Sequence, residues 1–522
     1  MERIPDSGSD RPERKGEKRW SGLSLAALLC TLVVGTQGCT GPALQPWHTE
    51  RLTLEFTAGQ VDEIQTFEDY RRLEDRLFEE LGEEVYAQVE TGPQFTLSRY
   101  SPGSAADPRT WHPDWNQSFE LPVDEAIGGV LLLHGMSDSP YTLRKLARSL
   151  AGRGYSVVGL RLPGHGTAPS GLKYVRWQDM AAAVRLSANH LATLVSGRPV
   201  HIVGYSTGAP LAIYYALEAL EEHELSEDTD DPALLPALPA SLVLISPAIG
   251  IHRAAALARF KAALGRVPGF GGLAWLQIVP EFDPYKYNSF ATNAGAQVHA
   301  LTSALRARLR SRARRRPETV LPPTLVLKST VDATVSNAAV VDRMFDLLKP
   351  DRHELILFDV NRASVKSRLM VSDPGPFTDR MMAESALPFT MTLVTNESPE
   401  SPAVVALHKP RGSSKVTRRE PLHLEWPRDL ISLSHLALPI PPDDPLYGRR
   451  PPENEDALFL GELAFRGERG LLVFPPDWLL RLRYNPFYAY LESRTIDWLD
   501  SANGTGRPES RSPAQASSAA SF

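Results

Sequence analysis

Cysteine is nearly absent from this chain of 522 residues, since only Cys30 and Cys39 occur and both lie in the first forty residues. The body of the protein therefore has no disulfide framework and no cysteine-based metal site. Net charge is also small, at −6. It gives no reason to expect a nucleic-acid partner, and we interpret the basic run from Arg306 to Arg316 as a solvated helix face.

The apolar segment LSLAALLCTLVV, at residues 23–34, is too short to cross a bilayer. A basic stretch precedes it, from Arg11 to Arg19, and the two together are typical of a secretory signal. A buried core helix is the alternative. Gly38-Cys39 resembles the cleavage site of bacterial lipoproteins, in which the cysteine is acylated, although Thr36 stands where such sites usually have Leu. We therefore expect export to the bacterial cell envelope or periplasm, with lipid attachment and membrane association through Cys39 or, alternatively, simple signal cleavage.

Apolar runs alternate with helical patterns along the rest of the chain. Strand signals begin with FTLSRY near residue 94 and SFELPV near 118, and helices are predicted over 140–152, 176–196 and 337–349. Buried strands are predicted at 128–135, 155–162, 199–203, 241–246, 324–329 and 353–358. This alternation predicts an α/β fold with a mostly parallel sheet and helices on both faces.

Changes in this rhythm divide the chain into segments. A helical extension with Tyr70, Leu73, Leu77 and Leu81 on one face precedes the core, and two insertions interrupt it. We read the first insertion as a helical cap over the active site, with an ordinary surface excursion as the alternative, and the second as a small antiparallel element. The predicted segments are signal 1–39, extension 40–93, core 94–252, cap insertion 253–320, core 321–359, second insertion 360–430, core completion with a histidine loop and C-terminal helix 431–500, and disordered tail 501–522.

The sequence GYSTG, residues 204–208, lies between an apolar strand pattern and a helical pattern. This is G-x-S-x-G in the strand–turn–helix context that a serine nucleophile requires. Gly204 and Gly208 lack the Cβ atoms that would collide where strand and helix meet. We therefore predict that Ser206 is a nucleophile rather than an ordinary turn serine.

A serine hydroxyl needs a base to accept its proton and a carboxylate to orient that base. In a sheet of this order the carboxylate should follow a later strand and the histidine should come last. Asp332, in TVDATV just past strand 324–329, is the predicted acid, and Asp359 after the next strand is the alternative.

Position alone does not select the histidine, because none closely follows strand 353–358. We choose His435, since its apolar surroundings end in prolines and suit a rigid loop; His408 and His423 remain as alternatives. For the oxyanion hole we predict the backbone amides of Met136 and Thr207. His134, at the end of its strand, is expected to orient the Met136 loop.

Three motifs, HGMSDSP (134–140), RLPGHGTAP (161–169) and GYSTG, together with the late Asp332 and His435, resemble the α/β-hydrolase fold. The resemblance is greatest to its branch of monoacylglycerol lipases, lysophospholipases and carboxylesterases, which overlaps with serine aminopeptidases. It implies that Ser206 is the nucleophile, His435 the general base and acid, and Asp332 its orienting partner. In one respect the chain departs from the family, because about a hundred residues separate Asp332 from His435.

These features predict an exported serine hydrolase that cleaves lipid-like or short acyl esters through an acyl-enzyme, with no metal or organic cofactor. The alternatives are an aminopeptidase-like enzyme, in which Glu281 and Asp283 would hold the substrate ammonium, and a catalytically silent binding protein on the same fold. The sequence leaves the oligomeric state open.

Overall fold

The computed structural model describes residues 43–226, 235–249, 271–332, 337–349, 352–361, 373–427, 430, 433–454, 457–461 and 482–504. The chain divides into two compact units, Met1–Ala43 and Leu44–Phe522, and every element named below lies in the second. The predicted signal segment, with Cys30 and Cys39, lies outside the described residues, as does the predicted tail beyond residue 504. Export and acylation therefore stay predictions.

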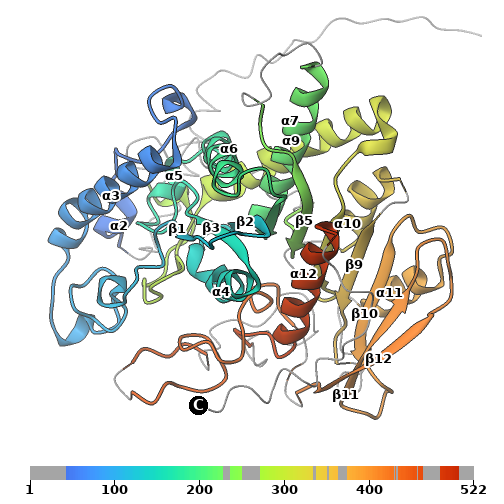
Figure 1. Ribbon diagram of the computed structural model, residues 1–522. Helices are drawn as coiled ribbons and strands as arrows, with labels where there is room; N and C mark the ends of the chain where they lie inside the picture. The colour runs from blue at the N-terminus through green and yellow to red at the C-terminus, as the bar shows by residue number, and fades with distance from the viewer. Residues whose placement is uncertain are drawn as a thin grey trace, which may run out of the picture. The chain divides into compact units, whose positions relative to one another are not determined.

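A ten-stranded sheet forms the centre of the second unit (Figure 1). Its strands in spatial order are β1 (Phe119–Leu121), β3 (Tyr155–Leu160), β2 (Gly128–Leu133), β4 (Val200–Tyr205), β5 (Pro239–Ile245), β8 (Thr324–Ser329), β9 (His353–Phe358), β10 (Thr390–Asn396), β11 (Ala403–Lys409) and β12 (Arg418–Glu425). The strands from β3 to β10 are parallel, whereas β1, β11 and β12 run antiparallel to their neighbours. The predicted mostly parallel sheet is confirmed.

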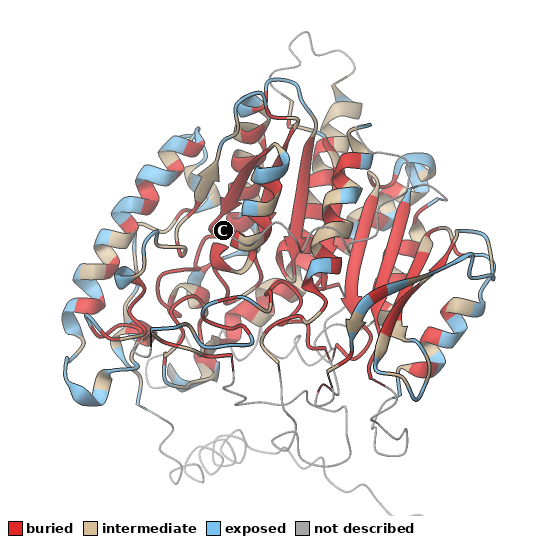
Figure 2. Ribbon diagram, turned by 60° about the horizontal axis from the view of Figure 1, so that its bottom comes forward, coloured by how far each residue is buried: buried red, intermediate tan, exposed pale blue. Residues whose placement is uncertain are grey.

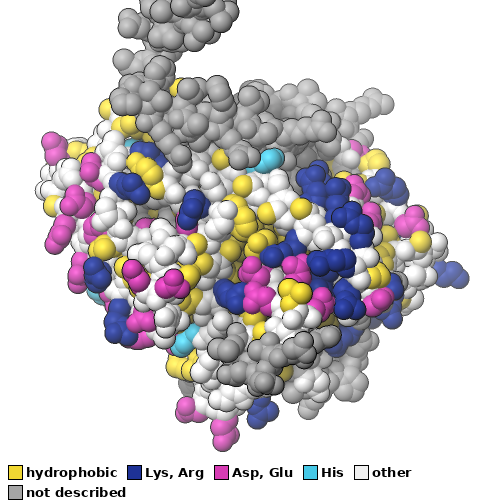
Figure 3. All heavy atoms as spheres, turned by 90° about the horizontal axis from the view of Figure 1, so that it is seen from above, with side chains coloured by type: hydrophobic (Ala, Val, Ile, Leu, Met, Phe, Trp, Pro, Cys, Tyr) yellow, Lys and Arg dark blue, Asp and Glu magenta, His cyan; other side chains and the backbone are white. Residues whose placement is uncertain are grey.

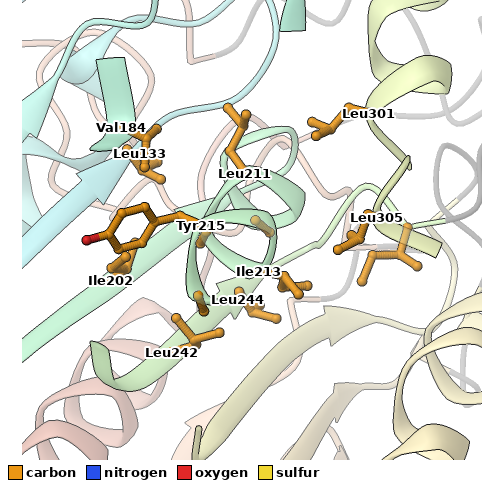
Figure 4. Packing of buried hydrophobic residues seen from close by; sticks show 14 of the residues in the cluster. Leu133, Val184, Ile202, Leu211, Ile213, Tyr215, Leu242, Leu244, Leu301 and Leu305 are labelled. Atoms are coloured by element: carbon orange, nitrogen blue, oxygen red, sulfur yellow. The ribbon is translucent and has the colours of Figure 1, made fainter. Parts of the chain in front are cut away.

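Helices cover both faces of this sheet because its strands are apolar on both sides. Val130 and Leu132 of β2 pack with α4 (Arg144–Arg153) and α12 (Tyr488–Ala502), while Leu131 and Leu133 pack on the opposite face. That opposite face carries α6 (Trp177–Leu194), α7 (Gly208–Leu225) and α9 (Thr292–Arg315). Figure 2 shows the central strands buried between helices whose outer sides are exposed, and Figure 4 shows the packing of α7 and α9 on β2, β4 and β5. Burial of each large apolar side chain contributes roughly 1.5–3 kcal/mol to folding.

The predicted N-terminal helix is α3 (Phe67–Glu84), which buries Tyr70, Leu73, Leu77 and Leu81 as expected. Its Tyr70 hydroxyl donates to the Arg161 carbonyl oxygen at 2.7 Å, which ties the extension to the loop after β3. Shorter elements complete the unit: α2 (Pro46–Thr49), α5 (Gly171–Tyr174), α10 (Asn337–Arg343), α11 (Gly375–Ala383) and the antiparallel pair β6 (Trp275–Gln277) and β7 (Phe290–Ala291). No helix among the described residues is both long and apolar enough to span a membrane.

The basic run at 306–316 is only partly the solvated face that we predicted. It forms the end of α9, and Arg308 and Arg315 pair with Glu221 of α7, while Arg312 is buried and pairs with Glu224 at 2.9 Å. Figure 3 shows basic and acidic side chains lying beside one another on this side of the molecule. These arginines therefore join two helices.

One strand prediction is wrong. The segment FTLSRY forms turns, because Arg99 is buried and bonds to loops instead: its amide donates to the Glu281 carbonyl and its guanidinium to the Gly166 carbonyl. The small antiparallel element predicted within 360–430 is present as β10, β11 and β12. They extend the main sheet, since β10 pairs in parallel with β9 and the antiparallel β11 and β12 follow it.

The predicted cap insertion, 253–320, does not form one unit over the active site. Residues 250–270 lie outside the described residues. The helix α9 belongs to the layer that covers the sheet, since Leu301, Leu305 and Leu309 lie in the same core cluster as Leu211 of α7. Within the described part of the insertion, α9 is therefore not a cap, and a cap formed by other residues of the insertion stays a prediction.

Candidate active site

Ser206 occupies a strained turn between β4 and α7. Its φ of 52° lies in the left-handed region, which non-glycine residues rarely adopt. Two hydrogen bonds hold the turn against the end of β5: the Ser206 amide donates to the Ile245 carbonyl oxygen at 2.9 Å, and its carbonyl accepts from the Ala248 amide at 3.0 Å. The turn directs the serine out of the carboxyl edge of the sheet, at the N-terminus of α7.

Three glycines allow the backbone to close around this serine. A Cβ on Gly204 would lie 2.5 Å from the Gly208 carbonyl oxygen, and one on Gly208 would lie 2.2 Å from the Leu133 carbonyl oxygen. Gly135, in the loop after β2, lies so close that an added Cβ would be 3.0 Å from the Ser206 Cβ. The glycines of the G-x-S-x-G motif thus serve the close approach predicted for them.

Asp332 follows β8 at the same edge of the sheet, two strands from β4. Its side chain is fully buried, and its Oδ2 accepts from Lys328 Nζ at 2.6 Å. Lys328 points from β8 and is itself fully buried. The sequence reasoning missed this lysine, although a lysine in the otherwise apolar TLVLKS, four residues before the acid, was a usable signal.

His435 lies beside this carboxylate, with its Nδ1 3.6 Å from Asp332 Oδ1. The two residues meet although about a hundred positions separate them in the chain. The alternative His408 lies in β11 and bonds to Thr392 and Glu420 on the neighbouring strands. His423 lies in β12 at the edge of the sheet.

The alternative acid, Asp359, sits after β9. It accepts from the Thr330 hydroxyl at 3.2 Å and from the Val360 amide at 2.9 Å. These contacts place Asp359 in the turns that follow β8 and β9. The ion pair with His435 is formed by Asp332.

A buried network anchors the loop that carries His435. The Asn485 side-chain amide donates to the Leu438 carbonyl, and the Asn485 backbone amide donates to that of Ile440 at 2.7 Å, which ties the loop to the start of α12. Further along, Asp444 pairs with Arg144 of α4 at 2.9 Å and accepts from the Tyr141 hydroxyl. The apolar, proline-stopped loop predicted around His435 is thus fixed on its C-terminal side.

The loop after β2 carries the predicted oxyanion amide of Met136. His134 fixes this loop: its Nε2 accepts from the Leu162 amide at 3.0 Å and its Nδ1 donates to the Gly135 carbonyl at 2.8 Å. Burial lowers the pKa of His134 well below its usual value, so the ring stays neutral. Within the described residues the backbone amides of Met136 and Thr207 donate to no protein group, as oxyanion donors require.

His165, from the PGHG motif, is also buried beside this loop. Its Nδ1 donates to the Pro163 carbonyl at 3.0 Å, and burial lowers its pKa to about 4. A neutral ring with these contacts has a structural role.

A cavity of about 550 Å³ opens beside the candidate triad. Tyr205 and Leu436, the neighbours of Ser206 and His435, both line it. Its other walls come from the segment after β2, from the end of β6 and the residues between β6 and β7, and from the loops at 440–447 and 482–483. The lining residues from these segments are Asp138, Thr142, Gln277, Val279, Pro280, Phe282, Asp283, Lys286, Tyr287, Asn288, Ile440, Tyr447, Leu482 and Arg483. The cavity is large enough for a small ester or part of an acyl chain.

The two carboxylates considered for an ammonium site are already held by the protein. Glu281 accepts from the Asn288 and Ser289 amides, and burial raises its pKa to about 7. Asp283 lines the cavity but accepts from the Tyr447 hydroxyl and pairs with Arg483 at 3.5 Å. Among the described residues no group of three or more His, Cys, Asp or Glu side chains is arranged to hold a metal ion.

The sequence profile described as the alpha/beta hydrolase family matches residues 130–380. Among curated proteins, the chain is 34% identical over 88 residues to a thermostable monoacylglycerol lipase of Bacillus sp. (strain H-257). It is 31% identical over 90 residues to a putative 2-succinyl-6-hydroxy-2,4-cyclohexadiene-1-carboxylate synthase of Haemophilus influenzae. Each match covers 17% of this chain and 34% of the relative, so the chain spans about a third of the length of these relatives.

Among solved structures, the monoacylglycerol lipase of Paleococcus ferrophilus is 19% identical, with a TM-score of 0.34, over 46% of this chain and 88% of that one. The family match agrees with the parallel sheet and with the serine turn after β4. The part of the chain that the profile matches, residues 130–380, has the α/β-hydrolase fold.

Proposed function

We propose that this protein is a serine hydrolase that cleaves carboxylic esters, with Ser206 as nucleophile, His435 as general base and acid, and Asp332 as the carboxylate that orients the histidine. The observation that carries the proposal is the pairing of His435 Nδ1 with Asp332 Oδ1 at the sheet edge from which the strained Ser206 projects. The lipase among the curated relatives supports an ester as the substrate class.

With Nδ1 directed at Asp332, Nε2 of His435 is the nitrogen that removes the Ser206 proton. The serine oxygen then bonds to the ester carbonyl carbon, and the backbone amides of Met136 and Thr207 stabilise the oxyanion. The alcohol leaves with the proton from His435, which forms the acyl-enzyme. Water then gives a proton to His435 and attacks the acyl carbon, so that the acid departs and the serine is restored.

The test is hydrolysis of 4-nitrophenyl esters of increasing acyl length by wild type, Ser206→Ala, His435→Ala and His408→Ala. We expect kcat to fall about 10⁴-fold or more in Ser206→Ala and in His435→Ala, because the triad acts as a unit. His408→Ala is the matched control and should keep its turnover. Ester turnover retained by Ser206→Ala would refute the proposal, and so would turnover of aminoacyl-naphthylamides without turnover of esters.

We further propose that the chain is exported and acylated at Cys39. This part rests on residues 23–39 alone. Expression in a bacterium fed labelled palmitate should label the wild type and leave Cys39→Ser unlabelled. Equal labelling of the two proteins would exclude the attachment site.

A further inference from the structure

The cavity beside the triad contains two cations that the proposed reaction does not use. Lys286 comes from the loop between β6 and β7, and Arg483 comes from the segment before α12. Lys286 Nζ pairs with Asp138 Oδ1 at 2.5 Å, and an Arg483 guanidinium nitrogen lies 3.5 Å from Asp283 Oδ2. All four side chains line the same cavity.

In both pairs the carboxylate is buried and the cation is the more exposed partner. The side-chain exposures are 6% for Asp138 against 26% for Lys286, and 1% for Asp283 against 22% for Arg483. The cations are therefore the members of the two pairs that are more accessible to a ligand.

Asp283 also has partners besides Arg483. Asp283 Oδ1 accepts from the Tyr447 hydroxyl and from the backbone amides of Tyr285 and Lys286. The ion pairs thus hold the two cations in place, and an ammonium with three donors and a guanidinium with five have hydrogens beyond those given to one carboxylate each. Cations fixed in advance lose little freedom when they bind an anion.

Lys286 is also close to the reacting groups. Its partner Asp138 lies two residues after Met136, and a Cβ on Gly135 would be 2.5 Å from Asp138 Oδ2 and 3.0 Å from Ser206 Cβ. The next residue, Tyr287, donates its amide to the Ser137 carbonyl at 2.8 Å. The loop that carries Lys286 is therefore fastened to the loop that carries the predicted oxyanion amide.

We propose that Lys286 and Arg483 form a subsite for an anionic substituent, a phosphate or a carboxylate, on the ester substrate. The proposal rests on the proposed ester hydrolysis and names its substrate class: esters that carry a negative charge near the scissile bond. Carboxylate and phosphate oxygens match the planar donors of the guanidinium and the point charge of the ammonium. Neutral esters fill the same cavity without using either cation.

Two pairs of substrates distinguish the two sources of the anion. The 4-nitrophenyl monoester of succinic acid and 4-nitrophenyl butyrate differ by a carboxylate on the acyl part. A 1-acylglycerol 3-phosphate and the corresponding 1-acylglycerol differ by a phosphate on the alcohol part. We expect wild type to prefer the anionic member of at least one pair in kcat/KM.

Arg483→Gln should lower that preference about 10-fold or more, because hydrogen bonds to a charged group are lost. Lys286→Met with Asp138→Asn should do the same, since the double change leaves no unpaired buried carboxylate. Lys145→Met is the matched control, because Lys145 pairs with Asp443 outside the cavity, and it should keep the wild-type preference.

A readout without turnover separates this inference from the proposed function. Ser206→Ala should bind glycerol 3-phosphate in calorimetry, bind glycerol at least 10-fold more weakly, and lose the phosphate binding when Arg483→Gln is added. Turnover of neutral esters without preference for either anionic substrate, together with no binding of glycerol 3-phosphate, overturns the subsite and leaves the ester hydrolysis standing. Absence of all ester turnover in a folded wild type refutes the proposed function, and with it this inference.

Discussion

Replacing Lys328 with methionine tests whether the predicted acid is a buried charge held by a buried partner. Lys328 Nζ lies 2.6 Å from Asp332 Oδ2, and both side chains are fully buried. Methionine fills a similar volume but leaves the carboxylate without its cation. Removing one partner of a buried ion pair costs about 3–5 kcal/mol, because the remaining charge is uncompensated.

Urea unfolding of wild type, Lys328→Met, Asp332→Asn and the double variant measures the coupling between the two side chains. We expect Lys328→Met to lower the free energy of unfolding by about 3–5 kcal/mol and the double variant to recover much of that loss, since no unpaired charge then remains. Lys145→Met provides the contrast of an exposed pair with Asp443, where the loss should stay below about 1 kcal/mol. A loss in Lys328→Met no larger than in Lys145→Met, or no recovery in the double variant, would refute the reasoning.

Two further predictions concern the turn and the core. Gly208→Ala would place a Cβ 2.2 Å from the Leu133 carbonyl oxygen, so both ester turnover and the melting temperature should fall. Gly152→Ala is the control and should leave turnover unchanged, because a Cβ there has nothing within 4 Å. Normal turnover in Gly208→Ala would contradict the close approach. Burial lowers the pKa of His201 to about 4, below its unfolded value of 6.5, so the neutral ring stabilises the fold above pH 6.5 and this contribution is lost as the pH falls toward 4. Between pH 6.5 and pH 4 the free energy of unfolding should therefore fall by up to about 3 kcal/mol less in His201→Gln than in wild type. Urea unfolding at several pH values measures this difference. An unchanged pH dependence would contradict the lowered pKa of His201.

The core of the fold could be predicted because its strands are apolar on both faces and short. The predicted strands 324–329 and 353–358 coincide with β8 and β9, and the serine turn lies between β4 and α7 as its motif indicates. The pattern failed where tertiary contacts override it. FTLSRY alternates like a strand, yet the buried Arg99 binds loop carbonyls.

The antiparallel end of the sheet was the harder case. The polar β12, RREPLHLE, has no apolar period because it is an edge strand that buries few side chains. The sequence of β10 predicts that it pairs with β11, the next strand in the chain, but it does not show that β10 also pairs with β9. The second pairing depends on whether the edge of β9 is left open by the rest of the fold.

The residues of the candidate site followed from chemistry and chain order more than from periodicity. Asp332 could be placed because it follows a strand, and His435 could be preferred only from its proline-rich loop, while their pairing needed the structure. The cations of the cavity, Lys286 and Arg483, give no local signal, because only folding brings their loops together.

Fluorophosphonate labelling followed by peptide mass spectrometry tests the central claim most directly. The probe modifies serines that are activated as nucleophiles, so the account predicts one adduct on the peptide that contains Ser206, and no adduct in Ser206→Ala. His435→Ala should label far more slowly, because the proton acceptor is lost. A folded wild type that does not react, or an adduct on another serine that persists in Ser206→Ala, would contradict the account.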